Sequence, residues 1–464
     1  MSVVRAVMVP HPPILLPEIG RGEEKKIQAT ADAYAQAAAF TAEARPDTIV
    51  VLSPHSVMYA DWFHISPGAG ASGSFASFGA PQVKCAVRYD EELTETLCAI
   101  AAQKQFPAGI QGEKDARLDH ATMLPLLWLQ KAYGAQALPP IVRIGLSGLP
   151  LTEHYRLGQM IAAAAEQLHR RIAVVASGDL SHRLKTDGPY GYRPEGPQYD
   201  RRIMDVMGRG AFGELFAFSE AFCDAAGECG HRSFTIMAGC LDGRAVQAKP
   251  LSYEGTFGVG YGVCLFAPGE ADPARQFLQQ EEARQALALQ ARRRAEDPYV
   301  QLARAAVEAW VRSNSELPLP AGLPAEMRTE RAGVFVSLHA HGALRGCIGT
   351  IRPAENCIAQ EIVRNGISAC SRDPRFAPVA PAELDTLEYS VDVLGPAEAI
   401  PSAASLDVHR YGVIVSSGGR RGLLLPDLEG VDTVEQQIAI AREKAGIAPE
   451  ETVRLQRFEV VRHV

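Results

Sequence analysis

The chain has 464 residues and a formal net charge of -8, from 46 Lys+Arg and 54 Asp+Glu. At about 150 residues per domain, this length allows two or three domains. The mildly acidic balance offers no basic surface for nucleic acid or for an anionic membrane. No stretch of about 18 uninterrupted apolar residues is present, so we expect no transmembrane helix. Nine cysteines without a CxxC pair indicate a reduced, cytoplasmic protein.

Residues 1–267 alternate β-branched runs with amphipathic stretches, which predicts an α/β domain. We expect strands at 3–9, 48–52, 140–146 and 171–177, with two short closing strands at 246–253 and 258–266. The expected helices cover about 23–43, 91–105, 121–132, 152–167 and 197–207. The Gly/Ser-rich stretch 56–80 is expected to be a long loop that borders a functional site.

A change of composition marks the end of this domain. Residues 268–297 are rich in Gln, Glu, Arg and Ala, which predicts a charged helical connector. Residues 298–464 follow as a second unit with its own helices, strands and Gly/Pro turns. We therefore predict two domains, 1–267 and 298–464, joined by the connector 268–297.

Three predicted strands of the first domain each end at a histidine. His11 follows the first strand within PHPP, His55 follows the second within SPH, and His182 follows RIAVVAS within SGDLSH. The flanking prolines restrict the backbone at His11, so this side chain would lose little entropy on binding a metal. Ligand sites in open α/β sheets lie beyond the carboxyl ends of the strands. We therefore expect these three histidines to lie close together.

The remaining histidines of this domain differ in their context. His120 stands in DHAT, at the start of a predicted helix, and is either a helix-start residue or part of the site. His64, His154 and His169 have no such context, and we expect them on the surface or in loops.

These motifs together resemble the LigB-like class III extradiol dioxygenases and the related Memo-like proteins. The resemblance spans residues 3–266 and rests on the PHPP start, SPH, DHATMLPLLWL, SGDLSH and AGECGHRSFTIMAGCLDG. It implies a central sheet flanked by helices and a non-haem Fe(II) site that acts on O2 and a catechol-like or phenolic molecule. Carried over by position, His11 and His55 would bind the metal. His182 would be the acid/base, and His120 would orient the substrate.

The third metal ligand is open between two neighbouring residues. The segment GECGH, residues 227–231, falls where the dioxygenases have a glutamate and the Memo-like proteins a cysteine. Glu228 would complete a two-histidine, one-carboxylate Fe(II) site, and we favour it. Cys229 would make a softer site suited to Cu(I) or Zn, and Glu254 is a more remote candidate. Alternatively, Glu228 is a carboxylate that stabilises a helix N-terminus.

The second unit resembles the AMMECR-type domain through LRGCIG at 344–349, SRDPRF at 371–376 and YGVIV at 411–415. This resemblance implies a compact α+β fold and no established activity. Arg345 and Cys347 are the functional candidates, because a cysteine close to arginines can react as a thiolate. The simpler interpretation is that Cys347 is a small hydrophobic residue buried at a strand turn and that the arginines hold loops together. KAG at 444–446 stands where the family has a late cysteine.

A LigB/Memo-like domain fused to an AMMECR-type domain resembles two components of the AmmeMemoRadiSam system in one chain. We expect an Fe(II)-dependent, ring-cleaving dioxygenase-type oxidoreductase. The alternative is a Memo-like metal-binding or scaffold protein without ring cleavage that works with a radical SAM partner. A third hypothesis is a metal-dependent lyase or hydrolase that uses the same pocket, because a fold does not determine a function. Related folds often associate, so we also expect a homo-oligomer.

Overall fold

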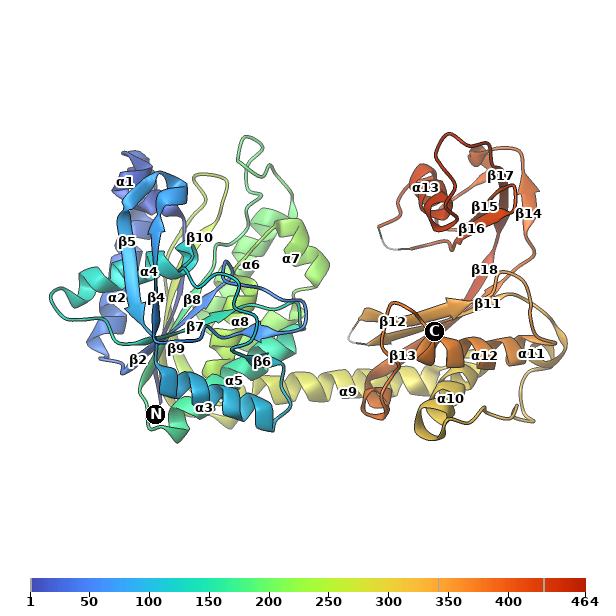
Figure 1. Ribbon diagram of the computed structural model, residues 1–464, viewed down its shortest axis with the longest axis horizontal. Coiled ribbons are helices and arrows are strands. Elements are labelled where there is room, and N and C mark those ends of the chain that lie inside the picture. The colour runs from blue at the N-terminus through green and yellow to red at the C-terminus, as the bar shows by residue number, and fades with distance from the viewer. Residues whose placement is uncertain (1, 341, 429) are drawn as a thin grey trace. The chain divides into compact units, whose positions relative to one another are not determined.

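The computed structural model describes residues 2–340, 342–428 and 430–464. The chain divides into two compact units, Met1–Ala283 and Arg284–Val464 (Figure 1). The division falls inside the helix α9 (Phe277–Ala295), within the segment predicted to be a helical connector. Among the described helices, none is both long enough and apolar enough to cross a membrane.

A six-stranded sheet with the order β7-β2-β8-β1-β10-β9 forms the centre of the first unit. Its parallel part consists of β1 (Val3–Val9), β2 (Thr48–Ser53), β7 (Ile141–Gly145) and β8 (Ile172–Ser177). The antiparallel edge consists of β9 (Arg244–Glu254) and β10 (Tyr261–Ala271). The parallel strands are almost continuous apolar runs, as expected for strands that are covered on both faces.

Helices cover both faces of this sheet, which confirms the predicted α/β class. Along β1, Ala6 and Met8 enter one core while Val7 and Val9 enter the other, because successive side chains of a strand point to opposite faces. One face is covered by α2 (Gln28–Glu43) and α4 (His120–Tyr133). The other is covered by α3 (Glu91–Gln103), α5 (Leu151–Gln167), α6 (Glu195–Arg209), α7 (Glu220–Ala226) and α8 (His231–Cys240).

The Gly/Ser-rich stretch 56–80 is not the long loop that its composition predicts. It contains β3 (Phe63–His64) and β4 (Gly70–Phe75), and β4 pairs with β5 (Ala80–Arg88) as an antiparallel hairpin. A Cβ atom at Gly70 would collide with the carbonyl of Val87, so this glycine permits a close backbone approach. The prediction was wrong because glycine serves close packing here rather than flexibility.

The second unit has two antiparallel four-stranded sheets, as an α+β fold requires. The first sheet contains β12 (Ala343–Gly349), β11 (Val334–Ala340), β13 (Leu387–Leu394) and β18 (Val460–His463), and it packs against α10 (Pro298–Ser313) and α12 (Ile358–Ser371). The second sheet contains β14 (Glu398–Ile400), β17 (Arg454–Phe458), β15 (Gly412–Ser417) and β16 (Arg420–Leu424), and it packs against α13 (Val434–Lys444).

Candidate metal centre

The carboxyl ends of β1 and β2, the two neighbours of β8 in the sheet, bring the predicted histidines together. His11 follows β1 and His55 follows β2, while His120 is the first residue of α4. Their possible ligand atoms all lie within 4.8 Å of one another. The two Nε2 atoms of His11 and His55 are 3.1 Å apart. Three converging imidazoles form a donor set suited to zinc, iron or copper.

A buried serine determines which nitrogen of His11 faces this group. Ser177, the last residue of β8, donates its hydroxyl proton to the carbonyl oxygen of Ala121 at 2.7 Å. The same Oγ lies 3.0 Å from Nδ1 of His11. Because the only hydroxyl proton is already used, Oγ accepts a hydrogen bond from Nδ1–H. Nε2 of His11 is therefore unprotonated and free to bind a metal.

Two further contacts hold the backbone of the PHPP segment. Oδ1 of Asp179 accepts a hydrogen bond from the backbone N–H of His11 at 2.7 Å. The hydroxyl of Tyr34, on α2, donates to the carbonyl of Pro10 at 2.8 Å. Burial raises the pKa of Asp179 to about 7 in spite of the hydrogen bond from His11. His11 is thus fixed at both its backbone and its ring.

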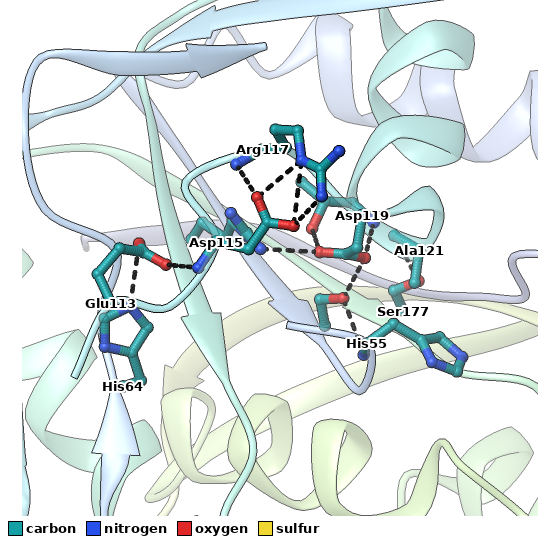
Figure 2. A network of polar contacts seen from close by, with 11 residues as sticks. His55, His64, Glu113, Asp115, Arg117, Asp119, Ala121 and Ser177 are labelled. Atoms are coloured by element: carbon teal, nitrogen blue, oxygen red, sulfur yellow. Dashed lines mark hydrogen bonds and ion pairs between the residues drawn. The ribbon is translucent and has the colours of Figure 1, made fainter. Parts of the chain in front are cut away.

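Asp119 positions the other two histidines (Figure 2). It is the N-cap of α4, where Oδ1 accepts the N–H of Thr122 at 2.9 Å. Oδ1 also accepts the hydroxyl of Ser53 at 2.7 Å, and Oγ of Ser53 accepts the N–H of His55 at 3.3 Å. Arg143, which is almost fully buried, forms an ion pair with Oδ2 at 3.3 Å. A single carboxylate therefore orients the start of α4 and the end of β2.

The three imidazoles are neutral at physiological pH. Burial lowers the pKa of His11 well below its usual value, and His55 and His120 lower it further. Partial burial lowers the pKa of His55, whose side chain keeps an exposed part, and burial lowers the pKa of His120 to about 4. A metal ion would therefore displace no proton from these ligands.

His182 lies beside this group with a free nitrogen. Its backbone N–H donates to the carbonyl of Gly227 at 3.2 Å, and its ring interacts electrostatically with His11 and His55. Nε2 is buried and has no hydrogen-bond partner among the described residues. Burial lowers the pKa of His182 to about 4, so this nitrogen is an unprotonated acceptor or the sole N–H of a neutral ring. A buried polar atom of this kind indicates a position for a ligand or a water molecule.

Two exposed aromatic rings stand next to these histidines. The ring of Phe78 lies 5.1 Å from that of His120, and the ring of Tyr190 lies 5.1 Å from that of His182. Both side chains are among the exposed large hydrophobic residues. Sequence reasoning did not single out either of them, nor Ser177, because no motif marks these positions.

Glu228 and Cys229 have different surroundings. Oε2 of Glu228 accepts the N–H of His231 at 2.6 Å, at the start of α8, and Glu228 does not join the histidine group formed by the described residues. This contact matches the helix-stabilising alternative, and the preference for Glu228 as third ligand stays a prediction. His120 belongs to the histidine group, while its predicted role of orienting the substrate stays a prediction. Sγ of Cys229 lies 3.6 Å from Nε2 of His11. Burial raises the pKa of Glu228 to about 7 and that of Cys229 well above its usual range.

The arrangement agrees with comparisons to known proteins. Residues 5–264 match the family of the catalytic LigB subunit of aromatic ring-opening dioxygenase, and residues 300–463 match AMMECR1. The chain belongs to the LigB family. It carries an AMMECR1 domain in its second half.

Some relatives of this LigB-family protein align with its whole length, and others align with only one part of it. Protein CA_C1420 of Clostridium acetobutylicum is 39% identical over 100% of this chain and 99% of its own length. A Thermotoga maritima protein is 48% identical over 36% of this chain and 98% of its own length. The crystal structure of PH0010 from Pyrococcus horikoshii is 33% identical, covers 35% of this chain and 88% of that chain, and has a TM-score of 0.34.

Other predicted residues of the LigB domain have structural roles. Glu254 accepts the N–H and the hydroxyl of Thr30 at 2.7 and 2.6 Å, and it is not part of the histidine group formed by the described residues. His64 and His154 are buried rather than on the surface. Nε2 of His64 lies 3.2 Å from Oε2 of Glu113 (Figure 2), and its Nδ1 contacts the carbonyl of Gln111 at 2.9 Å. No sequence motif marks either of these positions.

In the AMMECR1 domain, the two candidates have separate surroundings. Arg345 forms an ion pair with Glu383 at 2.6 Å and donates to the carbonyl of Ala377 at 3.0 Å. Arg345 therefore holds a loop, as the simpler interpretation states. Cys347, on β12, accepts a hydrogen bond from the hydroxyl of Ser337 at 3.2 Å and lines a cavity.

Proposed function

We propose that the LigB domain is a metal-dependent oxidoreductase that acts on a small catechol-like or phenolic molecule with O2. The observation that carries this proposal is the neutral three-histidine group of His11, His55 and His120, with the free Nε2 of His182 beside it. A LigB-family fold adds support, since that family is described by an aromatic ring-opening dioxygenase subunit.

The donor set fits a divalent transition metal. Nε2 of His11 is held unprotonated by Ser177, and His55 is exposed, so the group is reachable from solvent. His11, His55 and His120 would hold the ion. When bound, an ion such as Fe(II) supplies open coordination positions and redox chemistry for oxygen. Zn and Cu suit the same imidazoles, so the choice of Fe(II) rests on the proposed reaction.

His182 supplies the acid/base function in this proposal. A phenolic hydroxyl must lose its proton before the ring is attacked, and a neutral imidazole can accept that proton. With a pKa lowered to about 4, His182 is neutral at pH 7. When Nε2 of His182 is unprotonated, it accepts the proton of the phenolic hydroxyl. In a later step the protonated ring can donate this proton to the oxygen atom that leaves. Phe78 and Tyr190 offer ring faces against which an aromatic substrate can pack.

The test is oxygen uptake by the full-length protein. The chain is purified anaerobically, loaded with Fe(II) and mixed with a panel of catechols in an oxygen electrode. We expect oxygen consumption with at least one catechol, and its loss in His11→Ala. His64→Ala, which removes a buried imidazole outside the group, is the matched control. Bound Fe(II) without oxygen uptake from any catechol would refute the proposed reaction.

The position of Cys229 favours a second candidate function. Its sulfur lies 3.6 Å from Nε2 of His11, which suits a softer Cu(I) or Zn site. Such a site would belong to a Memo-like metal-binding protein without ring cleavage that works with a radical SAM partner. In that case Cys229→Ser would weaken Cu(I) binding strongly, and the wild-type protein would consume no oxygen. Unchanged Cu(I) affinity in Cys229→Ser would exclude this second function.

A further inference from the structure

The AMMECR1 domain contains a cavity of about 1020 Å³. Its walls come from β11, β12 and β13 of the first sheet, from β16 and the end of α13, and from the last turns of α9. Phe335, Ile351 and Leu423 give it an apolar wall. A volume of this size accommodates a small organic ligand, and such sites combine apolar walls with a few polar groups.

The side-chain carboxylates that line this cavity all form ion pairs with arginines. The three ion pairs are Glu296 with Arg304 at 2.8 Å, Asp392 with Arg462 at 2.8 Å, and Glu388 with Arg292. Arg375, another lining residue, is paired with Asp373 at 2.7 Å. None of these charges therefore requires a ligand.

Two cations on the wall have no carboxylate partner among the described residues. Lys444 ends α13 and is the only lysine of residues 284–464. Arg421, on β16, donates one hydrogen bond to Gln456 at 2.9 Å, while its Nε is buried without a partner. Burial lowers the pKa of Lys444, and burial together with Arg352 lowers that of Arg421. Arg421 is half-buried and its Nε lacks a partner among the described residues, so leaving it without a counter-ion is costly. Lys444 is exposed and adds a second positive charge to the same wall, which is therefore suited to an anion.

The thiol of Cys347 belongs to the same wall. Lys444 interacts electrostatically with both Cys347 and Arg375. Asp373 accepts the backbone N–H of Cys347 at 2.8 Å, and Arg375 donates to its carbonyl at 3.1 Å. Cys347 is therefore held firmly beside cations that a ligand can neutralise.

We propose that this cavity binds a small organic anion, whose carboxylate or phosphate group is held by Lys444 and Arg421 beside Cys347. The apolar body of the ligand packs against Phe335 and Leu423. This site lies within the second unit and does not depend on the function proposed for the LigB domain.

The thiol provides a direct probe of anion binding. The full-length protein is treated with iodoacetate, which is anionic, or with iodoacetamide, which is neutral and of similar size. The rate at which each reagent modifies Cys347 is followed by peptide mass spectrometry. The ratio of the iodoacetate rate to the iodoacetamide rate is then compared with the same ratio for N-acetylcysteine. We expect the ratio at Cys347 to exceed the reference about tenfold, which corresponds to about 1.4 kcal/mol. We also expect the iodoacetate rate to saturate, because the reagent binds first.

Matched variants decide whether the named cations cause this preference. Lys444→Gln and Arg421→Gln should each lower the ratio towards the reference. Arg312→Gln, which removes an exposed charge on α10, should leave it unchanged. The two cations lie on different elements, so the two variants are independent. Circular dichroism shows whether either variant is misfolded, and in that case the other variant decides the test. A wild-type ratio equal to that of N-acetylcysteine, or an equal decrease in Arg312→Gln, would overturn the proposal.

Protection experiments distinguish the two head groups. Benzoate and phenyl phosphate share an apolar ring and differ in their charged group. Slower modification of Cys347 by both reagents in the presence of benzoate indicates a carboxylate ligand, and the same effect of phenyl phosphate indicates a phosphate ester. If neither compound protects Cys347 at millimolar concentration, the cavity is not a site for aromatic organic anions and the proposal fails.

Discussion

Ser177→Ala tests how the metal centre is preorganised. The hydroxyl lies 3.0 Å from Nδ1 of His11 and 2.7 Å from the carbonyl of Ala121, and the serine is fully buried. Its removal leaves the His11 ring without the acceptor that keeps Nε2 unprotonated. Loss of such a supporting hydrogen bond typically costs about 10- to 100-fold in metal affinity. This range corresponds to about 1.4 to 2.7 kcal/mol at 25 °C.

The assay is a competitive titration of Zn²⁺ between the protein and a chromophoric chelator. Ser66→Ala is the matched control, because Ser66 is also buried and its hydroxyl has no hydrogen-bond partner among the described residues. Thermal denaturation of the apo proteins checks that both variants fold. Wild-type Zn²⁺ affinity in Ser177→Ala would refute the tautomer argument. A comparable loss in Ser66→Ala would attribute the effect to general loosening of the core.

Three further outcomes follow from the same geometry. His55→Ala removes one of the three imidazoles and should weaken Zn²⁺ binding more than Ser177→Ala does. His64→Ala, the control, should not weaken it. Equal Zn²⁺ affinities in the two histidine variants would contradict the assignment of His55 as a metal ligand. His182→Ala should keep its metal content and lose oxygen uptake, and a parallel loss of metal would make His182 a ligand. Burial raises the pKa of Asp200 to about 7, against about 3.9 for an unfolded chain. The folded state therefore keeps a proton that the unfolded state loses, and stability falls as the pH rises from about 4 to about 7, by at most about 4 kcal/mol. Asp200→Asn should flatten this dependence in urea denaturation at pH 5 and pH 8, and identical slopes for both proteins would show that Asp200 does not cause it.

The sequence predicted the parts of the fold that depend on local patterns. Apolar runs located the four parallel strands, and the turn to polar residues placed His11 and His55 at strand ends. Their convergence also followed from the sequence, because the carboxyl ends of parallel strands meet at one edge of a sheet. The resemblances to the LigB and AMMECR1 families could also be recognised from the sequence, because short distinctive motifs carry them. The family comparisons confirmed both.

What sequence patterns could not determine is the direction in which individual side chains point. Glu228 and Cys229 are adjacent, and a single residue of difference decides which one faces His11 and which one stabilises α8. The role of Ser177 depends on two partners, one from the loop after β1 and one from α4. Such contacts join residues far apart in the chain, so no local pattern records them.

Sequence alone thus determined the α/β and α+β classes, the two-part organisation and the histidines that meet beyond the sheet. The tertiary structure alone decided that His120 joins His11 and His55. It also decided that Lys444 and Arg421 face the cavity of Cys347 without carboxylate partners among residues 284–340, 342–428 and 430–464. The physical reason is that periodicity reflects which residues are buried, whereas ligand geometry and charge pairing depend on how distant elements pack against one another.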